Sequence, residues 1–151
     1  MADLELRLFI RATPENVWSI LSDLESQVRW MIDLHSLQIT SEQQSGAGTV
    51  VKATTKLFGL PIVKDVMEIT VWDQPRELAV VHSGQFTGTA YFRLEAVPGG
   101  CVFTWYEQFE PPLGPLGELG FKWVVGPHLR RVFSRSMENV RQLAERQSSI
   151  T

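Results

Sequence analysis

Residues 127–146 read PHLRRVFSRSMENVRQLAER, and this stretch predicts the element around which the fold is built. At 100° per residue, its apolar side chains fall in one arc and its charged side chains fill the other, as in an amphipathic helix. Twenty residues span about 30 Å of helix. Ser136 is the exception, because it lies near the middle of the apolar arc. We therefore predict a long C-terminal helix with one side buried.

The N-terminal segment predicts a strand followed by a helix. A leucine or isoleucine occupies every second position from Leu4 to Ile10, mostly with charged residues between them, which is typical of a half-buried strand. Thr13 and Pro14 then supply an N-cap and a proline at the first helical position. A helix is therefore expected from there, and a second short helical piece at about 25–31.

The middle of the chain predicts an antiparallel meander. Its short alternating segments are rich in Val, Ile, Thr and aromatic residues and are separated by turn residues. The expected strands are 35–43, 49–58, 62–73, 77–85, 88–97 and 101–110. The segment 111–126 is rich in proline and glycine, so we expect a loop there that leads into a helical turn.

These elements together predict one α+β domain over residues 1–151. Strands of eight to ten residues at about 3.3 Å each nearly match the length of the terminal helix. A curved antiparallel sheet of about seven strands that wraps this helix is the arrangement that buries the apolar side of each.

Composition and charge exclude several classes of protein. The 14 basic and 17 acidic residues give a net charge of −3 without a block of like sign, so no nucleic-acid partner is expected. The chain lacks the pattern of a signal peptide and any run near the ~18 apolar residues of a membrane span. We therefore expect a cytoplasmic protein that is not integral to a membrane. A single cysteine, Cys101, three scattered histidines and no phosphate-binding motif predict no metal and no cofactor.

Alternation along each predicted strand assigns an inner face that points toward the helix. A single β-bulge would reverse the remainder of a strand. The inner face mixes small residues, large aromatic residues and flexible methionines, which suits a cavity with apolar walls. The inward positions are Val51, Ala53, Thr55, Leu57, Val63, Asp65, Met67, Ile69, Val71, Leu78, Val80, His82, Ala90, Phe92, Leu94, Phe103, Trp105, Glu107 and Phe109.

Three ionisable residues lie on this inner face, namely Asp65, His82 and Glu107, with Ser136 opposite them on the helix. An unpaired buried polar group costs about 1–3 kcal/mol, so these groups are expected to pair with one another or to face a cavity. Glu107 and His82 could move protons in a reaction. They could equally form a structural hydrogen-bonded network, and the sequence leaves both interpretations open.

Several segments resemble the START/polyketide-cyclase superfamily (SRPBCC), in particular its polyketide cyclase/dehydrase-like branch. They are ATPENVWSILSD at 12–23, Trp30, the strand FTWYE at 103–107 and the long terminal helix. The resemblance covers nearly the whole chain. It implies a helix-grip fold with a cavity between the sheet and the C-terminal helix, in which relatives take sterols, lipids, polyketides or quinones.

Three functions follow as hypotheses. The first is binding or transport of a small hydrophobic ligand by a monomer or homodimer. The second is a polyketide cyclase or dehydratase that uses Glu107 and His82 for acid–base chemistry. The third is an interaction protein whose apolar loops, at 59–62 and 112–121, contact a partner protein. The residues expected to contact the ligand are Asp65, Met67, Ile69, His82, Phe92, Trp105, Glu107, Phe109, Phe133, Ser136 and Met137.

Overall fold

The computed structural model describes residues 2–110 and 114–150 of the chain. In these ranges the strands are β1 (Ala2–Ile10), β2 (Leu34–Ile39), β3 (Val50–Leu57), β4 (Leu60–Asp73), β5 (Glu77–Ser83), β6 (Thr87–Val97) and β7 (Gly100–Glu110). The helical segments are α1 (Pro14–Leu21), the 3₁₀-helix η1 (Leu24–Arg29), α2 (Gly114–Gly120), the π-helical turn η2 (Phe121–Val125) and α3 (Gly126–Ile150).

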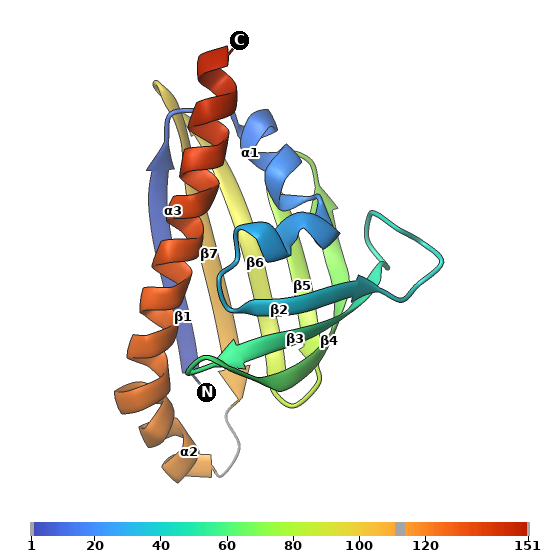
Figure 1. The fold of residues 1–151 in the computed structure, drawn as a ribbon, viewed down its shortest axis with the longest axis vertical. Helices are drawn as coiled ribbons and strands as arrows, with labels where there is room; N and C mark the ends of the chain where they lie inside the picture. Colours follow the sequence, from blue (N-terminus) through green and yellow to red (C-terminus); the bar gives the residue numbers. More distant parts are fainter. Residues whose placement is uncertain (1, 111–113, 151) are drawn as a thin grey trace.

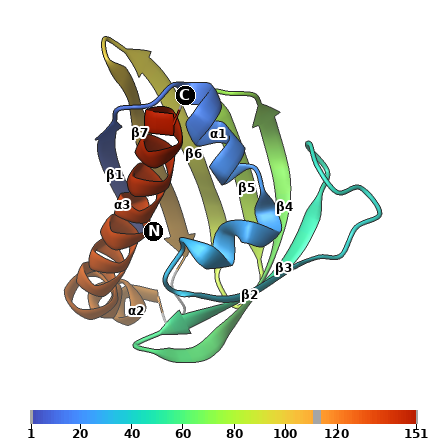
Figure 2. The same ribbon diagram turned by 45° about the horizontal axis from the view of Figure 1, so that its top comes forward.

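The strands form one antiparallel sheet in the order β1-β7-β6-β5-β4-β3-β2. The strands β2 to β7 follow one another in the sheet in the order of the chain. β1 pairs with β7, so that β1 and β2 form the two edges of the sheet. The sheet curves around α3, with α1 and η1 beside the helix (Figure 1; Figure 2). The predicted α+β helix-grip fold and its seven strands are therefore confirmed.

The helical run at the C-terminal end begins earlier than the sequence predicted. Helical structure starts at Gly114 and continues through η2 into α3, so the loop expected at 111–126 is wrong for residues 114–126; residues 111–113 lie outside the described residues. Pro115 does not prevent this start, because the first turn of a helix does not need its N–H. Phe121 is buried and packs against Phe109, with ring centroids 5.4 Å apart, and such packing outweighs the low helix propensity of the nearby glycines.

A β-bulge in β4 corrects one inward position. The pairing of β4 with β5 shifts between Ile69 and Val71, so that Trp72 and not Val71 lies opposite Leu78. Trp72 therefore faces the interior, where its ring meets Trp18 edge-on at 5.5 Å. Alternation alone assigned Val71 inward because an extra residue in one strand leaves no periodic signal.

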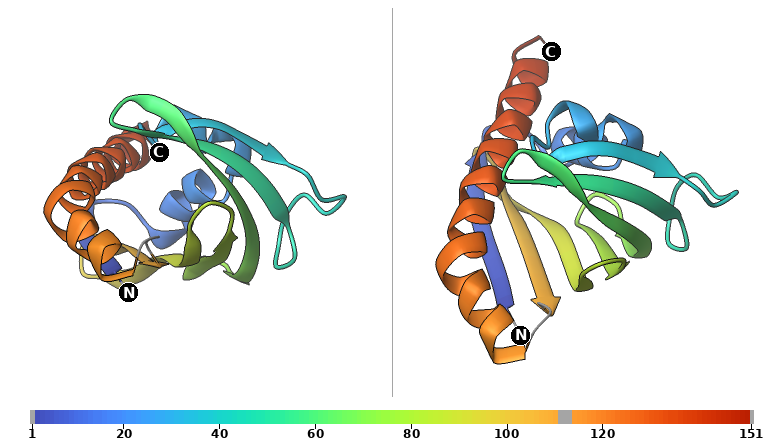
Figure 3. Two further views of the ribbon diagram at one scale, coloured as in Figure 1. Left: turned by 90° about the horizontal axis from the view of Figure 1, so that it is seen from below. Right: turned by 60° about the horizontal axis from the view of Figure 1, so that its bottom comes forward.

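The hairpin between β3 and β4 reaches across to α3. Its two turn residues, Phe58 and Gly59, both have positive φ, at 51° and 82°, as in the two-residue hairpin turn that suits the twist of the strands. The Phe58 ring stacks on His128 of α3 with centroids 4.4 Å apart. Figure 3 shows this hairpin beside α3 in both views. The tip of the hairpin thus closes one side of the space between sheet and helix.

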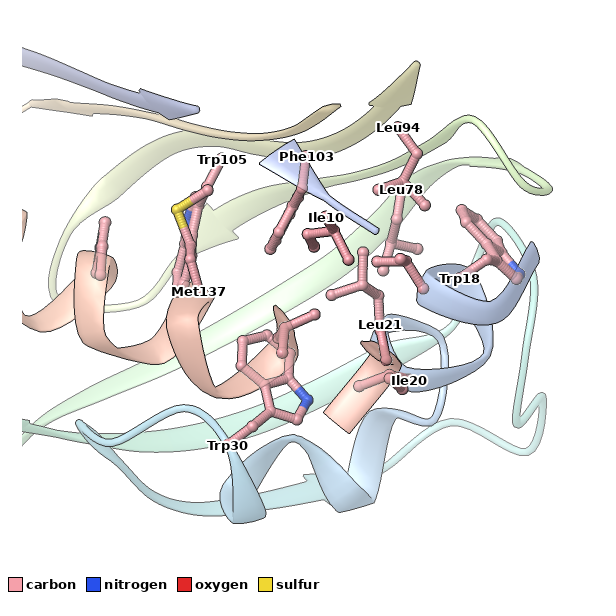
Figure 4. Packing of buried hydrophobic residues seen from close by; sticks show 14 of the residues in the cluster. Ile10, Trp18, Ile20, Leu21, Trp30, Leu78, Leu94, Phe103, Trp105 and Met137 are labelled. Carbon is pink, nitrogen blue, oxygen red and sulfur yellow. The ribbon is translucent and has the colours of Figure 1, made fainter. Parts of the chain in front are cut away.

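The interior is densely packed at the end where α1 lies. Ile10, Leu21 and Phe103 are fully buried, and they gather with Leu78 of β5 and Leu94 of β6 (Figure 4). This packed half anchors α1 on the sheet, and the other half of the interior is not filled in the same way.

Candidate ligand-binding cavity

A cavity of ≈ 530 Å³ lies between the inner face of the sheet and the helical segments. Its volume falls in the range of small-molecule sites, about 300–1,000 Å³. Residues from η1, α2, η2 and α3 form the helical side, and residues from β2 to β7 form the sheet side. Its wall is mostly apolar, and its aromatic members are Phe86, Tyr91, Phe92, Trp105, Phe109, Phe121 and Phe133.

Most of the residues expected to contact a ligand line this cavity. Nine of the eleven are on its wall, and Ser136 and Met137 are not. The nine are Asp65, Met67, Ile69, His82, Phe92, Trp105, Glu107, Phe109 and Phe133.

Ser136 was predicted to contact a ligand, but in the structure it bonds to the protein backbone and does not line the cavity. It is fully buried, and its Oγ accepts a hydrogen bond of 3.0 Å from the backbone N–H of Ile32. One turn further along α3, Asn139 donates from Nδ2 to the Trp30 carbonyl at 3.0 Å. These two bonds fasten the segment after η1 onto α3. Ser136 and the adjacent Met137 are both buried, and neither is among the residues that line the cavity.

Stacked aromatic rings join the sheet to the helix at the cavity wall. Trp105 of β7 stacks on Phe133 of α3, with centroids 4.1 Å apart and planes 9° from parallel. Phe92 of β6 meets Trp105 edge-on at 5.0 Å. Such pairs add to the stability from buried area, so they fix the distance between sheet and helix at this point.

Asp65 holds His82 in one orientation. A carboxylate oxygen of Asp65, Oδ2, bonds to Nδ1 of His82, and the other, Oδ1, accepts from the Gly84 N–H at 3.0 Å. Gly84 is required for this approach, because a Cβ there would lie 2.5 Å from the Asp65 Cα. Burial alone would lower the pKa of His82, but its bond to Asp65 and the nearby charges of Glu107 and Asp65 raise it overall. Nε2 of His82 is buried with no hydrogen-bond partner among the described residues.

Glu107 is a carboxyl group inside the protein. Burial raises its pKa to about 7, although the charge of His82 and a hydrogen bond from Trp105 act in the opposite direction. The donor is the indole Nε1–H of Trp105, 3.0 Å from Oε1 of Glu107. Near neutral pH this group can therefore either hold or release a proton.

Asp33 is a cavity residue that sequence reasoning missed. It lies between η1 and β2 and is 7% exposed. Burial raises its pKa to about 6, while its own backbone hydrogen bond and the charge of Lys56 oppose the rise. Its Oδ1 has no hydrogen-bond partner in the described part of the chain. Because Asp33 precedes the strand instead of lying on it, no alternation pattern could assign it to the interior.

Exposed apolar side chains surround one end of the cavity. Leu116 and Val124 line the cavity and are also 79% and 57% exposed, so the cavity reaches the surface there. The β3–β4 hairpin adds Phe58, Leu60 and Ile62, all more than half exposed. The hairpin, α2 and η2 together form this rim of the cavity.

Other chemistry has little support in the described residues. Cys101 is buried, and burial raises its pKa to about 11, which disfavours a thiolate nucleophile. Within residues 2–110 and 114–150, no three His, Cys, Asp or Glu side chains are grouped so as to hold a metal ion. Across the same ranges, no helix has the length and apolar character needed to cross a membrane.

Comparison with known proteins identifies the family. A model of the family described as "Polyketide cyclase / dehydrase and lipid transport" matches residues 1–145. The chain belongs to this family. The resemblance to the START/polyketide-cyclase superfamily is thereby confirmed.

Relatives of this family member are similar to it at low sequence identity. An uncharacterized protein of Mycobacterium tuberculosis is 26% identical over 130 residues, covering 84% of this chain and 82% of its own. The Zhui aromatase/cyclase from Streptomyces sp. R1128 has a TM-score of 0.77 at 17% identity, over 97% of this chain and 95% of its own. A START superfamily protein from Mycobacterium smegmatis has a TM-score of 0.67 at 12% identity, over 99% of both chains.

Proposed function

We propose that this protein binds or transports a small hydrophobic molecule in the cavity between the sheet and α3. The observation that carries the proposal is the cavity of ≈ 530 Å³ with its mostly apolar wall. Burial of apolar surface is worth roughly 25 cal/mol per Å², so a ligand that buries about 250 Å² gains about 6 kcal/mol before the costs of association. The exposed apolar rim would give such a ligand a path into the cavity.

The proposal is tested by searching for bound compounds and blocking the cavity. We expect native mass spectrometry and thermal shifts to detect binding from a panel of lipids, quinones and polyketides. Ala90 lies on the cavity wall, whereas Ala96, on the same strand, is exposed. Ala90→Phe should therefore abolish binding, and Ala96→Phe should preserve it. A panel without a single binder, or equal binding by both variants, would overturn the proposal.

A second candidate is a cyclase or dehydratase, favoured by two features of the same cavity. The unpartnered Nε2 of His82 is a possible proton acceptor, and the carboxyl of Glu107, with a pKa of about 7, is a possible proton donor or acceptor. We expect Glu107→Gln to lower turnover of an aromatic-polyketide precursor by about 10²-fold or more if this role is correct. An unchanged rate would remove Glu107 from the mechanism.

A further inference from the structure

The carboxyl groups and the imidazole of the cavity form one patch on its mostly apolar wall. We call it the acceptor patch, and its members are Asp33, Asp65, His82 and Glu107. Glu107 of β7 pairs with Ala90 of β6, and two residues further along β6, Gly88 pairs with His82 of β5. The strand between Glu107 and His82 therefore carries only small residues at these positions. The two polar side chains rise from strands about 10 Å apart, and both line the cavity.

Two atoms of the acceptor patch are buried without a partner. Oδ1 of Asp33 and Nε2 of His82 make no hydrogen bond to any described residue. Asp33 is 7% exposed, and the side chain of His82 is 10% exposed. Buried polar atoms in native proteins are nearly always satisfied. A ligand with hydrogen-bonding groups near these two atoms would supply the hydrogen bonds that the described residues do not make.

The charges in the acceptor patch determine which polar head group a ligand can bring into the cavity. Asp65 is already bonded to His82, so the charge of that imidazole is matched within the protein. Asp33 and Glu107 are the carboxyls that remain, and the charge of Asp33 raises the pKa of Glu107. Lys56 acts on Asp33 from the cavity wall. A further carboxylate on a ligand would add like charge in a poorly hydrated space.

We infer that the ligand carries a head group that donates hydrogen bonds, a hydroxyl or a protonated amine, and that acids with the same hydrophobic skeleton are rejected. This inference rests on the proposed function. A hydroxyl group suits the acceptor patch because it can donate a hydrogen bond to Asp33 or Glu107 and can accept one from a protonated His82. An amine donates to the same carboxyls and adds a favourable charge.

Isothermal titration with matched compounds near neutral pH tests the inference. The first series shares a naphthalene skeleton and consists of the alcohol naphthalenemethanol, the amine naphthylmethylamine and the acid naphthoic acid. Methylnaphthalene is the matching hydrocarbon without a polar head group. Dodecanol, dodecylamine, dodecanoic acid and dodecane repeat the series on a chain. We expect the alcohol or the amine to bind at least about tenfold more tightly than the acid on the same skeleton, the ratio that one charge-assisted hydrogen bond supplies. Comparing the affinity of the alcohol with that of the amine shows whether a hydroxyl or a protonated amine is the preferred head group.

The outcomes separate this inference from the function on which it rests. An acid that binds as tightly as its alcohol and amine overturns the inference and leaves the binding function intact. Failure of every compound on both skeletons overturns the proposed function itself. The double variant Asp33→Asn, Glu107→Gln should lose the preference for the amine while methylnaphthalene still binds, and Asp73→Asn, at the exposed end of β4, should keep it. A preference that survives the double variant would contradict the assignment to the acceptor patch.

Discussion

The buried carboxyl of Glu107 should make the stability of the protein depend on pH. Its pKa rises from 4.5 to about 7 in the folded state, mainly through burial. Each pKa unit corresponds to about 1.4 kcal/mol, so ionising this group costs the folded protein about 3 kcal/mol. The folded state holds the proton more tightly than the unfolded state, so stability should fall as pH rises from about 4.5 to about 7. Glu107→Gln removes the ionisation, so the variant should be more stable than the wild type by about 3 kcal/mol at pH values above about 8.

Urea denaturation of both proteins without ligand, at about pH 5 and about pH 9, measures this difference. The amide oxygen introduced by Glu107→Gln can still accept the Trp105 hydrogen bond, so the packing around the substituted side chain changes little. Glu110→Gln is the matched control, because Glu110 is on the same strand and exposed, where substitutions usually change stability by less than about 0.5 kcal/mol. If the Glu107→Gln variant gains no stability over the wild type between the two pH values, burial does not raise the pKa of Glu107 in the folded protein.

Three further predictions concern the surroundings of the cavity. Asp65→Asn should destabilise the protein by about 2 kcal/mol. The raised pKa of His82 stabilises the folded protein at pH values below the ordinary histidine pKa, and this stabilisation is lost as pH rises through the folded pKa. Thermal denaturation should therefore show a larger loss of stability from Asp65→Asn at about pH 5 than at about pH 9. Ser136→Ala should cost about 1–2 kcal/mol in chemical denaturation through the lost bond to Ile32, with unchanged ligand affinity; weaker binding would return Ser136 to the cavity wall. Trp72→Ala should cost about 3 kcal/mol and Val71→Ala less than about 1 kcal/mol, and the opposite order would place the bulge elsewhere.

The sequence predicts the sheet side of the cavity well because alternation is a direct consequence of strand geometry. Asp65, His82 and Glu107 all lie where the period of two places them. Val71 fails for a physical reason, since the bulge that turns it outward depends on how β4 pairs with β5. Nothing in the chemistry of Val71 or its neighbours marks that extra residue.

The helical side is less predictable. The period of 3.6 places Phe133 and Ser136 in one buried arc, but it does not say which part of the arc faces a cavity and which part is covered. That division is made by the segment after η1, which Ser136 and Asn139 fasten to α3. Asp33 reaches the cavity through the same segment. Its position depends on where the chain crosses over the sheet, which is a tertiary property and not a local one.

The proposed ligand binding requires that the space between the sheet and α3 is hollow and receives an apolar molecule. A crystal structure of the protein with the tightest-binding compound of the head-group series shows whether the compound occupies this space. We expect density for that compound beside the stacked rings of Trp105 and Phe133, with its head near His82, Glu107 or Asp33. Density for the compound only outside this space, or side chains that fill the space, would rule out ligand binding between the sheet and α3.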